Sequence, residues 1–233
     1  MENAYVLHRR RYRETSLIVE LLSRERGRIA AVARGALRRK SQLAAVLQPL
    51  VPLAIETRGR GELLTLTHAE PLAAATPALG ERLYAVFYVN ELILRLTAAH
   101  DPLGALFETY RATLAALAAD TPLEPLLRQF ELALLEAVGL GLELSSEAHG
   151  RAPLDPAREY LYVVEEGALA DPRGRHGCRI TGATLLALGG GEILVGEPAR
   201  EAKRLMRYVI NHHLDGRPLA SRELFAAARP QKP

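Results

Sequence analysis

The hydrophobic pattern of the chain changes period once, near residue 79, and this change limits the possible folds more than any other feature of the sequence. Before it, apolar residues gather in short β-type runs separated by glycine-containing turns. After it, they recur at helical spacing over longer segments. The pattern predicts an α+β protein in which a β part precedes a helical part.

Five strand candidates occur within residues 4–72. They are AYVLH, TSLIVELLS, RIAAVARG, LVPLAIET and ELLTLTHAE. RERG joins the second to the third and RGRG the fourth to the fifth, and both turns contain glycine, which permits tight reversals. Pro49 and Pro52 place the start of the fourth strand at an edge or bulge. Five short strands without a long helix among them predict a small closed barrel.

Helical patterns fill most of the remaining chain. They cover ALGERLYAVFYVNELILRLTAAH, LGALFETYRATLAALAA, LEPLLRQFELALLEAVG, TGATLLAL, EPAREAKRLMRYVINHHL and SRELFAAA. Residues 145–180 look irregular, with YLYVV as the only convincing strand. We therefore expect a barrel domain over 1–78 and a helical domain over 79–233, with an irregular insertion at about 145–180.

Charge is distributed unevenly along the chain. Residues 1–60 contain 13 Lys or Arg and 5 Asp or Glu, a balance of +8, whereas the rest carries −5. Twelve of those cations are arginines, whose planar guanidinium groups suit phosphate contacts. This asymmetry predicts that the first part meets a polyanion such as nucleic acid. A solvated basic face is the alternative.

The sequence also limits where the protein acts. No apolar run approaches the length that spans a bilayer, and the N-terminus MENAYVLHRRRY lacks the apolar region of a signal peptide. The single cysteine, Cys178, rules out an internal disulfide and fits a reducing compartment. We expect a cytoplasmic protein without membrane contact.

No catalytic constellation stands out. LGGGE at 188–192 lacks the ending of a phosphate loop and is predicted to connect two helices. A zinc site from His149, His176 and Cys178 would need a fourth ligand and unusual spacing, so a loop cysteine is the preferred interpretation. His212 and His213 suit a helix C-terminus. We therefore predict no enzyme activity, metal or cofactor.

Basic residues gather instead around predicted loops of the barrel, where this architecture binds single strands. Arg9, Arg10, Arg11 and Arg13 are assigned to the first connection between strands. The predicted DNA-binding residues are Arg9, Arg11, Arg34, Arg38, Arg39, Lys40, Arg58 and Arg60. Tyr5 and Tyr12 are the only aromatic residues in this part. Their scarcity favours electrostatic tracking of the strand over readout of its bases.

Ordered segments along nearly the whole chain resemble the bacterial RecO family. They are ETSLIVELLS, VARGALRRKS, LQPLVPLAIETRGRGELLTL, YVNELILRL, LRQFELALLEAVGLGLEL and HHLDGRPLASRELF. The resemblance implies an N-terminal OB-fold, a helical domain and a mediator of recombinational DNA repair that is not an enzyme. It also implies binding and annealing of single-stranded DNA, contact with the C-terminal tail of single-stranded DNA-binding protein (SSB), and loading of RecA together with RecR.

One departure from the family pattern concerns zinc. Many members carry four cysteines in the region that matches 147–180, whereas this chain keeps only Cys178 there. The chain thus resembles the branch that has lost the zinc site.

The resemblance also suggests a site for the SSB tail on the helical domain. Arg128, beside Leu127 and Phe130, would bind the terminal carboxylate of the tail. Leu106 and Phe107 are candidate pocket walls, with core packing as their alternative. For Arg128 the alternative is an intrahelical ion pair with Glu124 or Glu131.

Other interpretations remain open from the sequence. An OB-fold also serves structured RNA, and an unrecognised active site would make the protein an enzyme. In the C-terminal RPLASREL segment, Ser221 is predicted to cap the last helix. Arg217 and Arg222 either tie that helix to the domain, the preferred interpretation, or add to a basic surface.

Overall fold

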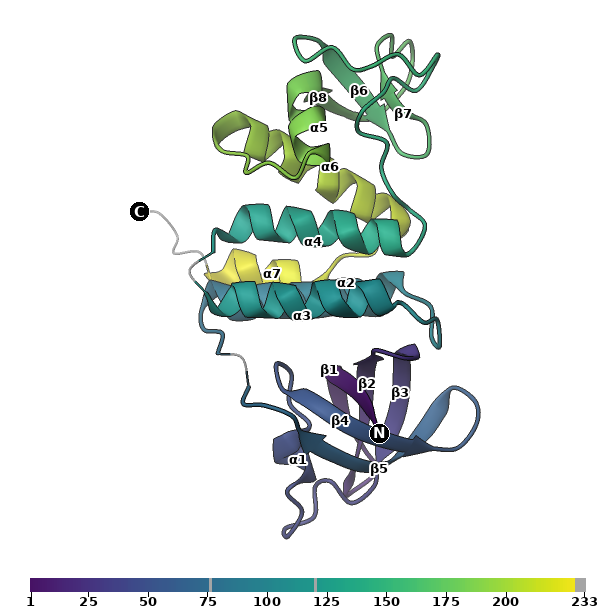
Figure 1. Ribbon diagram of the computed structural model, residues 1–233, viewed down its shortest axis with the longest axis vertical. Helices are drawn as coiled ribbons and strands as arrows, with labels where there is room; N and C mark the ends of the chain where they lie inside the picture. The colour runs from purple at the N-terminus through teal and green to yellow at the C-terminus, as the bar shows by residue number, and fades with distance from the viewer. Residues whose placement is uncertain (76, 120, 229–233) are drawn as a thin grey trace. The chain divides into compact units, whose positions relative to one another are not determined.

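The computed structural model describes residues 1–75, 77–119 and 121–228, with the side chains of 226–228 left out (Figure 1). The chain forms two compact units. The first comprises Met1–Thr121 and Leu219–Pro233, and the second is Pro122–Pro218. In this division the helices of 81–118 and the last helix group with the barrel, and the domains expected over 1–78 and 79–233 stay a prediction.

The barrel is confirmed. Its five strands are β1 (Glu2–Tyr12), β2 (Ser16–Ser23), β3 (Gly27–Ala33), β4 (Pro52–Arg58) and β5 (Leu63–Pro71). They close in the order β1-β2-β3-β5-β4, and only the β3–β5 pair is parallel. Pro52 begins β4, where it interrupts no ladder.

Alternating side chains fill the interior of the barrel. Val6, Val19, Leu21, Ile29, Leu53 and Ile55 are fully buried there. The short helix α1 (Leu43–Val46) lies between β3 and β4 and contributes Leu43, Ala44 and Val46 to this core. Closure of the sheet removes exposed strand edges, so the barrel needs no partner to satisfy its backbone.

Helices α2 (Glu81–Leu96) and α3 (Gly104–Ala118) cover one end of the outer face of the barrel. Tyr5, Leu22 and Arg28 form one cross-strand row on that face. The Tyr5 ring lies 5.3 Å from the ring of Tyr110 and 5.6 Å from that of Phe107. The guanidinium group of Arg28 donates to the carbonyl of Thr97, at the end of α2.

A buried polar chain fixes the same contact. Asn90 Nδ2 donates to the carbonyl oxygen of Leu7 at 3.0 Å, and the hydroxyl of Tyr110 donates to Asn90 Oδ1 at 2.8 Å. Burial raises the pKa of both Tyr5 and Tyr110, so both phenols stay protonated at neutral pH. Strand β1, α2 and α3 therefore share an interface in which these buried polar groups are hydrogen-bonded to one another.

The last helix, α7 (Ala220–Ala228), packs against α2 in the same unit. The carboxylate of Glu91 accepts hydrogen bonds from the backbone N–H groups of Ala220 and Ser221 and from the Ser221 hydroxyl. Burial tends to raise the pKa of Glu91, but these bonds and Arg95 outweigh it and lower the pKa. The prediction that Ser221 caps α7 is wrong, because Glu91 satisfies this helix start from 129 residues away.

The second unit contains α4 (Leu123–Ala137), α5 (Gly182–Gly189), α6 (Gly196–His213) and a small antiparallel sheet. The sheet has the order β7-β6-β8, with β6 (Glu159–Val163), β7 (Gly167–Leu169) and β8 (Cys178–Thr181). The sequence indicated only β6. Residues 189–192 connect α5 to α6, as expected. No helix in the described part of the chain is long and apolar enough to cross a bilayer.

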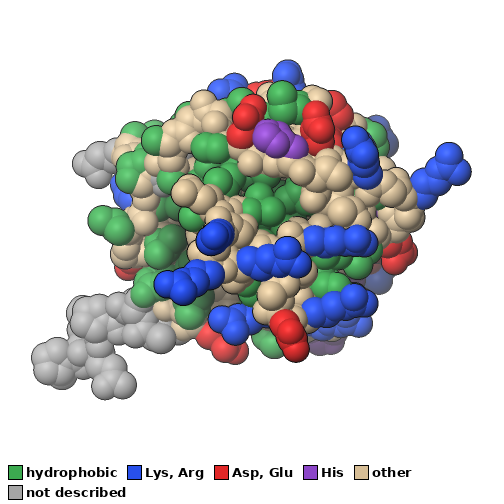
Figure 2. Space-filling model, turned by 90° about the horizontal axis from the view of Figure 1, so that it is seen from below, with side chains coloured by type: hydrophobic (Ala, Val, Ile, Leu, Met, Phe, Trp, Pro, Cys, Tyr) green, Lys and Arg blue, Asp and Glu red, His purple; other side chains and the backbone are tan. Residues whose placement is uncertain are grey.

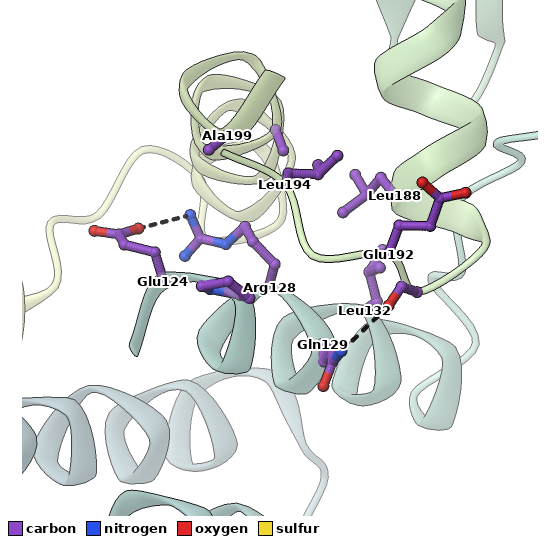
Figure 3. A pocket seen from close by; sticks show the side chains of 11 residues that line it. Glu124, Arg128, Gln129, Leu132, Leu188, Glu192, Leu194 and Ala199 are labelled. Atoms are coloured by element: carbon purple, nitrogen blue, oxygen red, sulfur yellow. Dashed lines mark hydrogen bonds and ion pairs between the residues drawn. The ribbon is translucent and has the colours of Figure 1, made fainter. Parts of the chain in front are cut away.

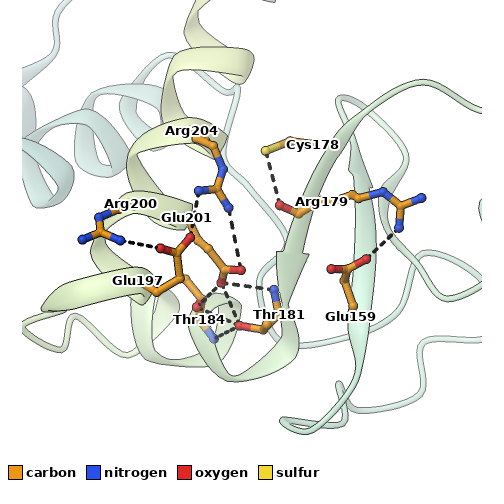
Figure 4. Close-up of polar contacts among 9 residues, drawn as sticks. All are labelled: Glu159, Cys178, Arg179, Thr181, Thr184, Glu197, Arg200, Glu201 and Arg204. Carbon is orange, nitrogen blue, oxygen red and sulfur yellow. Dashed lines mark hydrogen bonds and ion pairs between the residues drawn. The ribbon is translucent and has the colours of Figure 1, made fainter.

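A buried carboxylate joins that sheet to its helices (Figure 4). Glu201 Oε2 on α6 accepts hydrogen bonds from the Thr181 backbone N–H, the Thr181 hydroxyl and the Thr184 hydroxyl. Arg204 lies 3.8 Å from the other oxygen. Because Thr181 also caps α5, this cluster holds β8, α5 and α6 together.

Candidate nucleic-acid interface

A basin opens on the outer face of the barrel, at the end that the helices leave uncovered. It is lined by Tyr12, Arg13, Glu14, Thr15, Ser16, Val32, Arg34, Gly35, Arg38, Leu63, Leu64 and Thr65. These residues come from the β1–β2 turn, the ends of β2 and β3, the loop after β3 and the start of β5. In OB-folds the β2–β3 face and the β1–β2 and β4–β5 loops bind oligonucleotides. The basin occupies that part of the barrel.

Cations dominate the surface around the basin. Figure 2, which views the molecule from the barrel side, shows Lys and Arg side chains gathered over one part of that face, next to exposed hydrophobic side chains. Arg34, Arg38, Arg39 and Lys40 are exposed in the turn and loop that leave β3, as predicted. Arg34 and Arg38 line the basin itself. Arg39 and Lys40 extend the cationic surface along the loop.

Two further predicted residues border the basin. Arg58 ends β4 opposite Thr65, and Arg60 lies in the β4–β5 loop. Both side chains are exposed. The end of β4 and the β4–β5 loop thus each place a cation near the start of β5, which contributes Leu63, Leu64 and Thr65 to the basin.

The assignment of Arg9, Arg10 and Arg11 to a connection is wrong, because β1 continues to Tyr12. Arg9 and Arg11 pair with Val19 and Leu17, which face the core, whereas Arg10 lies on the outer face. The Arg9 guanidinium donates to the carbonyls of Ala44 at 2.7 Å and Leu47 at 3.1 Å. It therefore stabilises the end of α1, and its contact with DNA stays a prediction.

Sequence reasoning missed several residues of the basin. Arg13 was assigned to the first connection but not to the site, and Tyr12 was noted only as an aromatic residue. Ser16, Leu63 and Thr65 were not singled out. The strand pairing that brings β5 beside β3, Ala31 to Leu64 and Val32 to Thr65, joins residues more than 30 positions apart. Alternation within HRRRYR, which puts Arg10 and Tyr12 on one face, was the available signal.

The second unit contains a smaller apolar pocket beside Arg128 (Figure 3). Leu132 on α4, Leu188 on α5 and Leu194 in the α5–α6 loop provide its apolar walls. The enclosed space is small, about 20 Å³, so a larger group would have to lie at its mouth or open it. Ile193 and Val195, on either side of Leu194, are both strongly exposed.

Arg128 makes the intrahelical contacts that the sequence offered as its alternative. Its guanidinium group pairs with Glu131, which is fully buried, and lies 3.9 Å from Glu124. Burial tends to raise the pKa of Glu124, but the hydrogen bond and charge of Lys203 and the charges of Arg128 and Arg207 lower it. The pocket therefore contains a carboxylate as well as a cation.

The other residues predicted for the SSB tail are buried. Leu127 and Phe130 are core residues of α4. Leu106 and Phe107 are core residues of α3 in the first unit, where Phe107 contacts Tyr5. None of these four lines the pocket beside Arg128.

The region that matches the zinc module has no ligand cluster. Within the described residues, no three His, Cys, Asp or Glu side chains are grouped to hold a metal ion, so His149, His176 and Cys178 do not form a site. Burial raises the pKa of the Cys178 thiol. Arg173, Arg175 and Arg179 in this region pair with Asp171, Glu166 and Glu159.

A closed barrel of this strand order, with arginine-rich loops around an open basin, defines an OB-fold protein suited to nucleic acid. Comparison with known proteins gives the family. The family model described as recombination protein O N terminal matches residues 1–75, and the one described as recombination protein O C terminal matches 79–223. The chain belongs to the RecO family of DNA repair and recombination proteins.

Curated relatives match over nearly their full length. The DNA repair protein RecO of Methylococcus capsulatus is 47% identical over 228 residues, covering 98% of this chain and 93% of the relative. That of Halorhodospira halophila is 47% identical, covering 97% and 96%. That of Vibrio parahaemolyticus is 40% identical, covering 96% and 92%.

Proposed function

We propose that the protein is a non-enzymatic recombination mediator that binds single-stranded DNA and anneals complementary strands coated with SSB. With RecR it would promote RecA loading during recombinational repair in the bacterial cytoplasm. The observation that supports this proposal best is the basin at the open end of the barrel, with Arg34 and Arg38 in its wall and Arg39 and Lys40 beside it.

Annealing requires that two phosphate backbones approach each other while their bases stay free. Guanidinium and ammonium groups screen the repulsion between phosphates and release counterions, which gives affinity without dependence on sequence. The exposed cations around the basin supply that screening. A surface with few aromatic residues leaves most bases unstacked and available for pairing.

Annealing of two complementary strands, each coated with SSB, tests the proposal. We expect the wild-type protein to accelerate duplex formation and the variant Arg38→Ala/Arg39→Ala/Lys40→Ala to lose most of that acceleration. Failure of the wild type to accelerate annealing would contradict the mediator function. Equal rates for both proteins would show that this loop is only a solvated surface. Competition with duplex RNA distinguishes DNA annealing from a role on structured RNA.

We also propose that the second unit receives the acidic, aromatic-ended tail of SSB in the pocket beside Arg128. Leu132, Leu188 and Leu194 would contact the terminal aromatic ring, and Arg128 would exchange part of its pairing with Glu124 for the terminal carboxylate. Ile193 and Val195 would add apolar contact at the rim.

Binding of a synthetic tail peptide, measured by fluorescence anisotropy, tests this partner. Arg128→Ala should weaken binding about tenfold or more, because a charge-assisted hydrogen bond contributes about 1.5–3 kcal/mol. Amidation of the peptide's C-terminus should weaken binding to the wild type but have little further effect on Arg128→Ala. Leu224→Ser changes an exposed leucine of the other unit and serves as the control. Equal sensitivity of both proteins to amidation would reject Arg128 as the carboxylate partner.

A further inference from the structure

The two aromatic residues of the barrel have opposite surroundings. Tyr5 is buried against Phe107 and Tyr110 and has no surface to offer a ligand. Tyr12 ends β1 and lines the basin. From the sequence, Tyr5 was as compatible with the core as with a stacking role, and the structure places it in the core.

Arg13, the residue after Tyr12, contacts the tyrosine ring. Arg13 has φ 54°, a left-handed conformation that turns the chain from β1 towards β2. Its guanidinium carbon lies 5.2 Å from the centroid of the Tyr12 ring, within the range of a cation–π contact. This contact with Arg13 orients the ring, which reduces the ordering that a ligand must impose. Leu63, which is 45% exposed, adds apolar surface to the same basin.

The charges within the basin are not uniform. Arg34 and Arg38 lie in the part that follows β3, and Glu14 lies in the β1–β2 turn beside Tyr12. Arg38 folds over Gly35, so closely that a Cβ at Gly35 would lie 3.2 Å from its Nε. The phosphate of a nucleotide would be attracted to Arg34 and Arg38, whereas beside Tyr12 the carboxylate of Glu14 offsets the charge of Arg13. Its base would then lie towards the aromatic end, where Glu14 would accept from the base N–H groups.

We propose that Tyr12 is a stacking platform for a single nucleobase of the bound strand, with Arg34 and Arg38 holding the adjacent phosphates. The inference rests on the proposed binding of single-stranded DNA and adds to it a fixed position for one base and its adjacent phosphates. One base is anchored on the ring, and its neighbours along the strand remain unstacked. The protein thereby grips a strand without occupying the bases that must pair during annealing.

A thymidine oligonucleotide with one 2-aminopurine tests the platform, because stacking on an aromatic ring quenches the fluorescence of this base. We expect wild type and Tyr12→Phe to quench it on binding, whereas Tyr12→Leu and Tyr12→Ala do not. Affinity should fall by roughly 5- to 150-fold in Tyr12→Ala, the range for loss of one base–aromatic stack. Tyr208→Ala, which alters a half-buried tyrosine of α6 outside the basin, should bind like the wild type.

Salt dependence separates stacking from charge. Tyr12→Leu should keep the wild-type dependence of affinity on salt, whereas Arg38→Ala should reduce its slope by about 0.7, the value for one phosphate contact on a single strand. Wild-type affinity and quenching in Tyr12→Leu would overturn the platform and leave DNA binding intact. Absence of salt-dependent binding by the wild type would instead overturn the proposed function.

Discussion

Reversal of charge in the basin should abolish most binding of single-stranded DNA. In Arg34→Glu/Arg38→Glu we expect affinity to fall by about a hundredfold or more at low salt, since two phosphate contacts become repulsions. The slope of log affinity against log salt should lose about 1.4 for those two contacts. Fluorescence anisotropy with a labelled oligonucleotide between about 50 and 200 mM salt measures both quantities.

A matched variant distinguishes local contact from overall charge. Arg173→Glu/Arg175→Glu changes the net charge by the same amount on the β7–β8 loop, where both arginines pair with acids. It should retain most of the wild-type affinity. If both double variants lose affinity equally, the basin is not the DNA-binding surface.

The second large effect concerns the turn between β2 and β3. Gly27 has φ +65°, and a Cβ at this position would lie 1.7 Å from the carbonyl oxygen of Asp101. We expect Gly27→Ala to lower the free energy of unfolding by about 2–5 kcal/mol. Left-handed strain and a backbone clash both oppose the new side chain. Denaturant unfolding, followed by circular dichroism, measures the loss.

Gly61→Ala is the control for that substitution. Gly61 also has a positive φ, +90°, but a Cβ there meets no atom within 4 Å. Its replacement should therefore cost only the backbone strain, about 1 kcal/mol. A similar loss in both variants would show that the clash with Asp101 adds nothing to the cost of the side chain at Gly27.

The barrel could be predicted because its core strands alternate clearly and its turns contain glycine. The extent of β1 could not be predicted. A bulge between Val6 and His8 shifts the alternation, and the segment His8–Arg11 contains no apolar residue that would mark it as strand. Polar strand residues are held there by the ladder with β2, and no local pattern reports that pairing. The three-residue strand β7 is too short for a periodic signal.

The basin was partly predictable, because part of it follows from where the strands end. Loop cations such as Arg34, Arg38 and Arg60 can be located once the strands are known. The walls of both concave sites come from distant segments. Leu63 joins the basin through parallel pairing with Ala30, and Leu194 joins the pocket beside Arg128 from a different loop. Likewise, the sequence around Ser221 does not indicate that the carboxylate of Glu91 accepts the first N–H groups of the last helix.

The return of α7 to the first unit has a consequence for synthesis on the ribosome. The barrel, α2 and α3 are complete by Thr121, yet the helix that docks on α2 begins only at Ala220. At about 5–20 residues per second, the intervening segment Pro122–Pro218 takes roughly 5 to 20 seconds to translate. During that interval the nascent first unit lacks its final helix, and the surface of α2 that receives α7 stays uncovered. Chaperones that recognise apolar surface have this window in which to act on the growing chain.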